Sequence, residues 1–236
     1  MTKVKQKAIA KAKLMPKARF ITFEGGEGVG KSTQAKRLVN SLKNKAIMAV
    51  RTREPGGTPK AEAIRSFILQ GKSESWGAGA EAILFASARL DHVNELIAPN
   101  LKKGTWVISD RFLDSTRAYQ GLTGGVNDTL ISALEELALN DNNPDLTILL
   151  DMDPKKAFQR MRTRDADKSL AGEVDRFEKE NLDWHIKLRE NFIKIANNNT
   201  KRFVIISADK SEEDLAKAIW QAVVSKFPEL KEEKKT

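Results

Sequence analysis

The chain has 236 residues, enough for one α/β domain with a sizeable core or for two small domains. It contains no cysteine, which excludes disulfides, thiolate metal sites and a cysteine nucleophile, and no apolar run approaches the roughly 20 residues of a membrane span. The net charge is +9, from 41 Lys and Arg against 32 Asp and Glu. Because an apolar signal-peptide core is also absent, we expect a cytoplasmic protein.

Most of the positive charge lies before the first acidic residue, Glu24. Seven cations come first: Lys3, Lys5, Lys7, Lys11, Lys13, Lys17 and Arg19. Without these seven charges the net charge falls from +9 to +2, so the remaining chain is close to balanced. A lysine-rich arm can touch RNA or anionic lipid, but it is more often a solvated extension. We therefore predict a basic, flexible extension over residues 1–18, and we expect neither nucleic acid nor a membrane as a partner.

Five short apolar segments alternate with helical patterns along the remaining chain. The predicted strands are residues 20–23, 47–51, 106–109, 146–150 and 203–207. The predicted helices are residues 33–45, 60–70, 78–101, 127–139, 154–164 and 174–197. This alternation is typical of parallel strands joined by helical crossovers. We predict a single α/β domain over residues 19–227, with an open five-stranded parallel sheet of the P-loop NTPase type, helices on both faces, and a frayed tail over residues 228–236.

The first predicted strand is followed by a glycine-rich loop with the spacing G-x-x-x-x-G-K-S, the P-loop that binds nucleotide phosphates. Glycines allow the backbone to turn successive N–H groups inward at a helix N-terminus. Lys31 can then reach the β- and γ-phosphates, and the Ser32 hydroxyl can bind Mg²⁺. The order strand, loop, helix argues against a chance glycine-rich turn. The predicted ATP-binding residues are Gly25, Gly26, Glu27, Gly28, Val29, Gly30, Lys31, Ser32 and Thr33.

Chemically suggestive residues follow the other predicted strands as well. The sequence R-E-P-G-G-T follows the second strand, Asp110 and Arg111 follow the third, and D-M-D follows the fourth. Because the carboxyl ends of parallel strands meet at one edge, we expect one site there. An N-K-x-D motif that would read guanine is absent. The arginines exceed what one triphosphate needs, and so indicate a second phosphorylated ligand: Arg53, Arg89, Arg111, Arg160, Arg162 and Arg164.

As a set, these motifs resemble the thymidylate kinases, a family of P-loop nucleoside monophosphate kinases, and specifically the bacterial type with arginines in the lid. The resemblance covers about residues 19–227 and rests on residues 23–33, 52–59, 84–89, 110–121 and 175–178. It implies transfer of the γ-phosphoryl group of ATP to dTMP with Mg²⁺ and a mobile lid over about residues 160–174. It also implies a homodimer that packs through helices such as 78–101 and 127–139.

The resemblance further implies an acceptor site for dTMP. In that site Phe85 stacks on thymine, Arg89 donates to the base oxygen O4, and Tyr119 crowds the ribose 2′ position. Arg53 and Arg111 contact the acceptor phosphate. From the residues alone, Phe85 can also be core in a helix, and that alternative stays open although the stacking role is favoured. The complete implied set is Glu27, Arg53, Phe85, Arg89, Arg111, Thr116, Tyr119 and Gln120.

For the reaction itself the resemblance implies Ser32 and Asp110 as metal-organising residues. Some relatives carry a catalytic arginine inside the P-loop, but here that position is Gly28, so the lid arginines are expected to replace it. Without the resemblance, Asp110 and Arg111 would form an ordinary strand-end ion pair, and the lid arginines a solvated helix face. The implied catalytic residues are Lys31, Asp110, Arg111, Arg160, Arg162 and Arg164.

Two further expectations concern charge and protonation. A buried Glu27 among phosphates needs a partner, and Arg111 or Arg53 is expected to supply it. His92 and His185, the two histidines, are expected at exposed helix positions.

Two alternative functions remain open. The chain can be a kinase for another pyrimidine monophosphate, such as dUMP or UMP. It can also be a nucleotide-dependent binding protein whose basic arm engages nucleic acid.

Overall fold

The computed structural model describes residues 17–166 and 176–231. Its centre is one sheet of five parallel strands in the order β2-β3-β1-β4-β5. This arrangement confirms the predicted open parallel sheet. The strands are β1 (Phe20–Glu24), β2 (Ala49–Arg53), β3 (Trp106–Asp110), β4 (Leu146–Asp151) and β5 (Phe203–Ser207).

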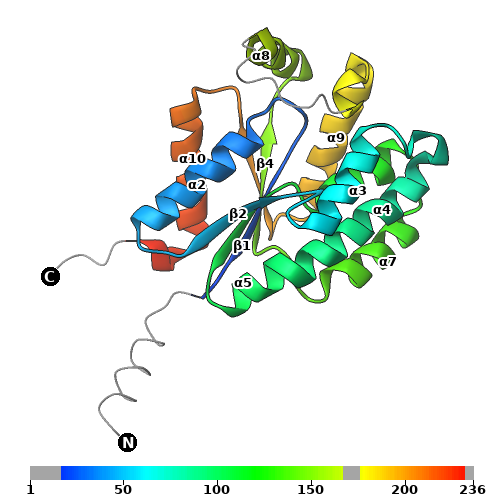
Figure 1. The fold of residues 1–236 in the computed structure, drawn as a ribbon. Helices are drawn as coiled ribbons and strands as arrows, with labels where there is room; N and C mark the ends of the chain where they lie inside the picture. Colours follow the sequence, from blue (N-terminus) through cyan, green and yellow to red (C-terminus); the bar gives the residue numbers. More distant parts are fainter. Residues whose placement is uncertain (1–16, 167–175, 232–236) are drawn as a thin grey trace, which may run out of the picture.

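Helices cover both faces of the sheet, as predicted (Figure 1). On one face lie α2 (Lys31–Asn44) and α10 (Glu212–Lys226), and on the other face lies a larger layer. That layer contains α3 (Pro59–Leu69), α4 (Gly77–His92), α5 (Ala98–Lys102), α7 (Asp128–Leu139) and α9 (Leu182–Asn198). The remaining helical segments are short or peripheral: α6 (Leu113–Thr116), α8 (Pro154–Ala166), two π-helical turns (Val93–Ile97 and Arg117–Thr123) and 3-10 turns at Glu74–Trp76, Arg176–Lys179 and Pro228–Leu230.

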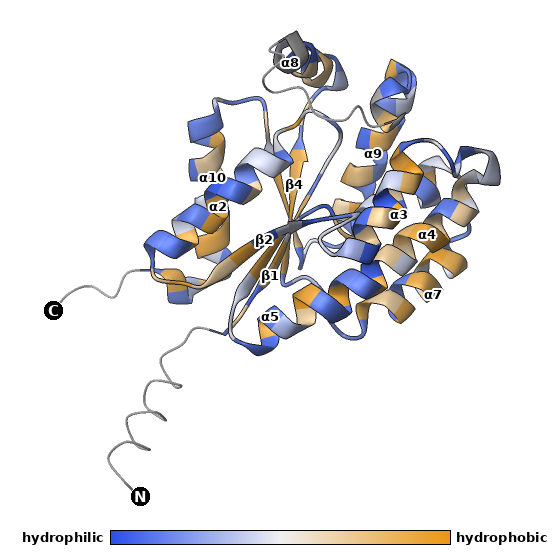
Figure 2. Cartoon of the chain, in the orientation of Figure 1, coloured by the Kyte–Doolittle hydropathy of each residue, from blue (hydrophilic) through white to orange (hydrophobic). Residues whose placement is uncertain are grey.

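The burial of the strands follows from this layering. Strands β1, β3 and β4 are apolar and buried along most of their length, because helices cover both of their faces. The edge strands β2 and β5 alternate between buried and more exposed positions. Figure 2 shows the strands as a strongly hydrophobic centre, while the outer side of α2 is hydrophilic. On the inner side of that helix, Leu38 and Leu42 pack into the same core as Ile219 of α10.

The structure changes two predicted boundaries near the C-terminal end. The predicted helix over residues 174–197 was wrong at its start, because α9 begins at Leu182, where the Asn181 side chain caps it by accepting from Trp184 N at 2.9 Å. The tail was predicted to fray from residue 228, yet Pro228–Leu230 form a 3-10 turn with Leu230 buried. Residues 1–16 and 232–236 lie outside the described residues.

The predicted lid over residues 160–174 is described only up to residue 166, as the end of α8, and the rest lies outside the described residues. The lid and the single-domain boundaries therefore stay predictions. None of the helices in the described ranges is both long and apolar enough to span a membrane.

Candidate active site

The P-loop connects β1 to α2 and lies at the carboxyl edge of the sheet. Two of its glycines are required by close contacts. A Cβ on Gly25, which has φ +134°, would come within 2.4 Å of Leu150 O. A Cβ on Gly28, with φ +71°, would come within 2.7 Å of Ala157 O in α8. The backbone at residue 28 therefore disfavours the arginine that some P-loops carry there.

Lys31 is folded back onto the loop that precedes it. Its Nζ donates to Gly26 O at 2.6 Å and to Gly25 O at 3.1 Å. Burial, followed by the nearby charge of Arg111, lowers the pKa of Lys31. The ammonium group thus lies directly over the loop, where phosphate oxygens can replace the two carbonyls.

Ser32 and Asp110 meet at the start of α2 and the end of β3. The Ser32 hydroxyl donates to the Asp110 carboxylate. Both groups bind through oxygen, which suits Mg²⁺, an ion that usually takes one or two protein ligands together with phosphates and water. No cluster of three or more His, Cys, Asp or Glu side chains occurs in the described part of the chain, so a metal cage built by protein alone is not seen there. The pair fits Mg²⁺ bound together with a nucleotide.

Glu27 forms the centre of a hydrogen-bonded cluster at the P-loop. Arg111 Nη2 donates to Glu27 Oε1 at 2.6 Å, and the Tyr119 hydroxyl donates to the same oxygen, also at 2.6 Å. Burial alone would raise the pKa of Glu27, but the charges of Arg111 and Lys31 hold it at about 2. Glu27 is therefore a permanent anion. The prediction that Arg111 or Arg53 would pair with it is confirmed for Arg111.

A hollow next to this cluster brings most of the predicted acceptor residues together. We call it the acceptor hollow, and it lies between the P-loop, α4 and the segment after β3. Phe85 is half-buried on its wall, so its ring is accessible from the hollow. Seven of the eight predicted residues line it: Glu27, Phe85, Arg89, Arg111, Thr116, Tyr119 and Gln120.

Arg53 is the exception. It ends β2 and pairs with Glu62 of α3 at 3.1 Å, with its side chain 55% exposed. It does not line the acceptor hollow. The structure therefore does not bring Arg53 together with Arg111.

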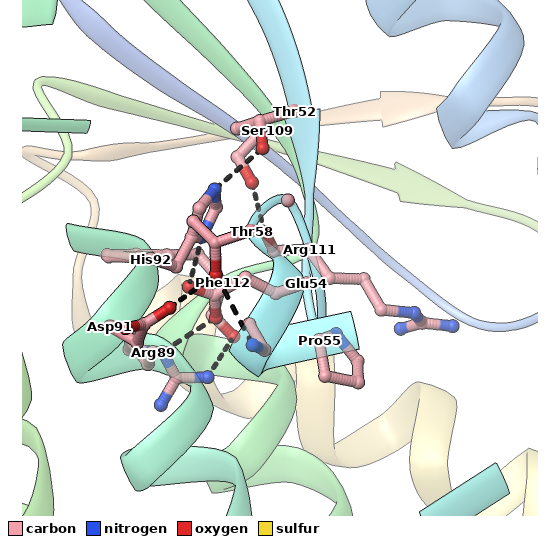
Figure 3. Close-up of polar contacts among 12 residues, drawn as sticks. Thr52, Glu54, Pro55, Thr58, Arg89, Asp91, His92, Ser109, Arg111 and Phe112 are labelled. Carbon is pink, nitrogen blue, oxygen red and sulfur yellow. Dashed lines mark hydrogen bonds and ion pairs between the residues drawn. The ribbon is translucent and has the colours of Figure 1, made fainter. Parts of the chain in front are cut away.

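Arg89 lines the acceptor hollow and is fixed by hydrogen bonds, of which Figure 3 shows those with its neighbours. Its Nε donates to Glu54 Oε2 at 2.7 Å. Its Nη2 donates to Thr116 Oγ1 at 3.0 Å and to Phe112 O at 3.1 Å. The sequence analysis did not single out Glu54, although it stands inside the R-E-P-G-G-T motif beside Arg53.

A second hollow lies on the other side of Glu27, between the P-loop, the end of β4 and α8 and α9. Arg189 of α9 lines it and makes a two-pronged ion pair with Asp151, at 2.6 and 2.8 Å. His185 also lines it and packs edge-on against Phe158, with ring centroids 4.7 Å apart. Glu27 borders both hollows, so the two hollows meet at the P-loop.

Arg160 and Arg162 are the two lid arginines whose side chains the structure describes. Arg160 donates to Ala208 O at 2.9 Å and to Lys210 O at 3.1 Å, in the segment that follows β5. Arg162 is exposed on α8. The side chain of Arg164 lies outside the described residues. A catalytic role for these three stays a prediction.

Several buried polar residues near the site were not foreseen. Glu24, at the end of β1, accepts from Phe112 N at 2.8 Å and from Ser115 Oγ at 2.6 Å. Burial, followed by the charge of Asp114, raises the pKa of Glu24 to about 8. The expectation that both histidines are exposed was wrong, because His92 is 0% and His185 is 5% exposed. Their helical positions gave no signal of burial.

Comparisons with known proteins agree on one relationship. A family model described as thymidylate kinase matches residues 23–219. The thymidylate kinase of Rhodopseudomonas palustris (strain ATCC BAA-98 / CGA009) is 49% identical over 208 residues, which is 88% of this chain and 89% of the relative. That of Bradyrhizobium sp. (strain ORS 278) is 45% identical over 207 residues, 88% of this chain and 90% of the relative.

A solved structure gives the same result in three dimensions. The crystal structure of thymidylate kinase from Ehrlichia chaffeensis is similar with a TM-score of 0.68 and 31% sequence identity, covering 88% of this chain and 100% of that one. The matched family region includes strands β2 to β5, the P-loop and the acceptor hollow.

Proposed function

This chain belongs to the thymidylate kinase family and is an enzyme that phosphorylates dTMP, and we propose that ATP bound at its P-loop donates the γ-phosphoryl group. Membership of the family confirms the resemblance found in the motifs. In our proposal dTMP occupies the acceptor hollow, and the product is dTDP. The observation that carries this assignment is the Glu27–Arg111 pair, which joins the P-loop to the acceptor hollow that both residues line.

The reaction needs positioning and charge neutralisation more than proton transfer. The attacking atom is an oxygen of the dTMP phosphate, which is already anionic, so a general base is not required. Lys31 binds the donor phosphates, and Arg111 contacts the acceptor phosphate beside them. Glu27, with a pKa of about 2, is ionised at physiological pH and holds Arg111 in place rather than exchanging a proton.

Ser32 and Asp110 are the residues that would hold magnesium. The ion, when bound with ATP, supplies charge neutralisation at the phosphates. The Ser32 hydroxyl, which donates to Asp110 here, would turn its oxygen toward the ion. Asp110 remains close to Arg111, so the acceptor and donor groups share one electrostatic environment.

Base and sugar recognition occupy the other end of the acceptor hollow. Phe85 offers its ring as a stacking surface for thymine, which is worth about 1 kcal/mol beyond the buried area. Arg89 donates to a keto oxygen of the base, and so disfavours cytosine, which has an amino group there. The Tyr119 hydroxyl is held by Glu27, and its ring contacts Phe177 at 5.3 Å between centroids, so it forms a fixed wall next to the sugar.

The test is ADP formation from ATP and Mg²⁺, with dTMP, dUMP, UMP, dCMP and dGMP offered one at a time. We expect fast turnover with dTMP, slow turnover with dUMP and almost none with the others. Equal rates for UMP and dTMP would remove the proposed role of Tyr119. Faster turnover with dUMP or UMP than with dTMP would contradict the assigned acceptor.

A homodimer is the second part of the proposal. Exposed apolar side chains lie on α4 and α7, which pack against each other: Ile83, Leu130 and Leu137 are 50%, 40% and 64% exposed. Such side chains are suited to a subunit interface. Sedimentation of the wild type should give a dimer, and Leu137→Asp should shift it toward monomer. A monomeric wild type at micromolar concentration would contradict the proposal. The cytoplasmic location stays a prediction.

A further inference from the structure

Arg89 leaves one edge of its guanidinium for a ligand. Its Nε and Nη2 are occupied by Glu54, Phe112 O and Thr116. No hydrogen bond from Nη1 is found within residues 17–166 and 176–231, and Arg89 lines the acceptor hollow. The side chain is 3% exposed, so its direction is set by its protein partners rather than by water. The direction of Nη1 therefore depends on how firmly Glu54 is held.

A buried histidine stands behind Glu54 (Figure 3). His92 is the last residue of α4 and lies one helical turn after Arg89. Its Nδ1 is 3.0 Å from Glu54 Oε1, and its Nε2 is 2.6 Å from the Thr52 hydroxyl on β2. His92 is 0% and Glu54 5% exposed. The four residues Thr52, His92, Glu54 and Arg89 form one continuous hydrogen-bonded chain from the sheet to the hollow.

The partners define which ring nitrogen carries the proton. The carboxylate of Glu54 has only acceptors, so Nδ1 must be the donor of that contact. In the neutral ring Nε2 is then an acceptor, and the Thr52 hydroxyl donates to it. Each carboxylate oxygen of Glu54 has its own donor, Oε1 from His92 and Oε2 from Arg89.

The turn that follows β2 covers this chain of contacts. Gly57 has φ +88°, and a Cβ there would come within 2.5 Å of Thr52 Oγ1 and 2.6 Å of His92 Nε2. The backbone of the turn thus lies directly against the Thr52–His92 pair. Thr58, the next residue, donates to Asp91, the neighbour of His92 on α4. A side chain at residue 57 would force the histidine away from Glu54.

We propose that His92 is a positioning residue for recognition of the acceptor base. Its Nδ1–H fixes the Glu54 carboxylate, and Glu54 in turn aims Nη1 of Arg89 at a keto oxygen of the pyrimidine. The inference rests on the proposed function, because it requires the base to bind beside Arg89. Residues that orient a contacting group commonly matter about 10-fold or more, although they never touch the ligand.

Two substitutions at residue 92 separate orientation from packing. His92→Asn keeps an amide N–H near the position of Nδ1, whereas His92→Leu fills similar space without a donor. For His92→Leu we expect kcat/KM for dTMP to fall about 10-fold, mostly through KM, and the preference for dTMP over dCMP to fall by about the same factor. His92→Asn should keep that preference within about 3-fold of the wild type. The inference would be overturned if the wild type and both variants showed the same preference for dTMP over dCMP.

The control is Val223→Ala, which opens a cavity in the core on the opposite face of the sheet, where Val223 is 0% exposed. It should lower the melting temperature without changing the preference between dTMP and dCMP. A wild type that does not distinguish dTMP from dCMP would overturn the proposed function, and the inference with it. A selective wild type beside an equally selective His92→Leu would overturn the inference alone.

The proton position can be read in the unmodified protein. The chain has only two histidines, so its ¹⁵N imidazole spectrum contains two rings, and the ring missing from His92→Asn is that of His92. We expect Nδ1 of His92 to carry a proton. A ring protonated on Nε2 alone would overturn the inference, because it could not donate to Glu54.

Discussion

The proposed site has a phosphate end, at the P-loop beside the acceptor hollow, and a base end, inside the hollow around Arg89, and the two ends hold their charged groups in different ways. At the phosphate end, Lys31 donates to loop carbonyls and Ser32 to Asp110, which are partners that phosphate or a metal ion can replace. At the base end, Arg89 is fixed by Glu54 and Thr116, and these contacts are buried. Lys31 and Ser32 thus have exchangeable partners, whereas Arg89 has permanent ones; Arg111, held by Glu27, is the fixed group of the phosphate end.

The difference separates two tasks of the enzyme. Phosphates move and change charge during transfer, so the groups that bind them must be able to form new contacts. A base is only recognised, and recognition improves when the donor is already oriented. Changes at the phosphate end should therefore act on kcat, and changes at the base end on KM and on the choice of base. The following variants test this division, starting with the largest expected effect.

Lys31→Met removes the ammonium group from the P-loop. We expect kcat to fall about 1,000-fold or more, because neutralisation of the donor phosphates is lost. The KM for dTMP should change less than about 3-fold, since Lys31 is not part of the base end. Steady-state kinetics with saturating ATP measure both quantities. A large rise in the KM for dTMP with kcat unchanged would contradict the assignment of kcat effects to the phosphate end.

Arg111→Lys and Arg53→Lys form a matched pair at the phosphate end. Arg111 contacts Glu27, Gly25 O and Ser115 at once, with distances of 2.6 to 3.1 Å, and lysine lacks the planar fork for this. We expect kcat/KM to fall about 100-fold for Arg111→Lys and less than about 5-fold for Arg53→Lys. Similar losses in both would show that Arg53, exposed in this structure, joins the site during turnover.

Phe85→Leu tests the base end. Leucine keeps an apolar wall but removes the flat surface, so we expect the KM for dTMP to rise about 10-fold while kcat changes little. If Phe85 only fills core space, the effect should instead appear in the melting temperature, with kinetics close to those of the wild type. Measuring both in one preparation decides between the two roles that the sequence left open.

Glu24→Gln tests a residue placed beneath both ends. Glu24 binds Phe112 N and Ser115, and those two segments also contact Arg89 and Arg111. The folded state raises the pKa of Glu24 from 4.5 to about 8, so the folded protein holds this proton more tightly than the unfolded chain. The free energy of unfolding therefore decreases as pH rises from 4.5 to about 8.

Glutamine does not titrate, so the variant should lack this decrease. The melting temperature of the variant minus that of the wild type should therefore be about 5 °C higher at pH 8 than at pH 5. Kinetic constants should change less than in the other variants. If the melting temperatures of the variant and the wild type change by the same amount between pH 5 and pH 8, the assigned pKa of Glu24 is contradicted.

The sequence was sufficient to locate the five strands and the P-loop, although it placed the second strand at residues 47–51, two residues before β2. Continuous apolar runs such as 146–150 identify covered parallel strands, and the glycine spacing identifies the phosphate loop. It was less informative where local signals compete. Phe177 was counted on the apolar side of the helix, so the start of α9 was placed too early; Phe177 lies in a separate 3-10 turn, and Asn181 caps α9.

The residues of the candidate site also fall into those that the sequence located and those that it missed or misplaced. Motif residues such as Phe85, Arg89 and Tyr119 come together as expected. His92 was missed because a histidine at the end of an amphipathic helix looks exposed until the turn at Gly57 covers it. Arg53 was placed in the site because the family resemblance implies a phosphate contact there and because it follows the second predicted strand, yet its side chain pairs with Glu62. Side-chain direction depends on tertiary partners that spacing does not encode.

The two ends of the described chain are joined away from the active site. Arg19 pairs with Glu229 at 2.6 Å and lies 4.8 Å from the centre of the Phe227 ring. Arg19 precedes β1, so this junction is at the amino edge of the sheet, whereas the P-loop is at the carboxyl edge. A short peptide that replaces the residues beyond this junction would therefore link the segments around Arg19 and Glu229, and new ends opened elsewhere would give a circularly permuted enzyme or a sensor fusion with an unobstructed nucleotide site.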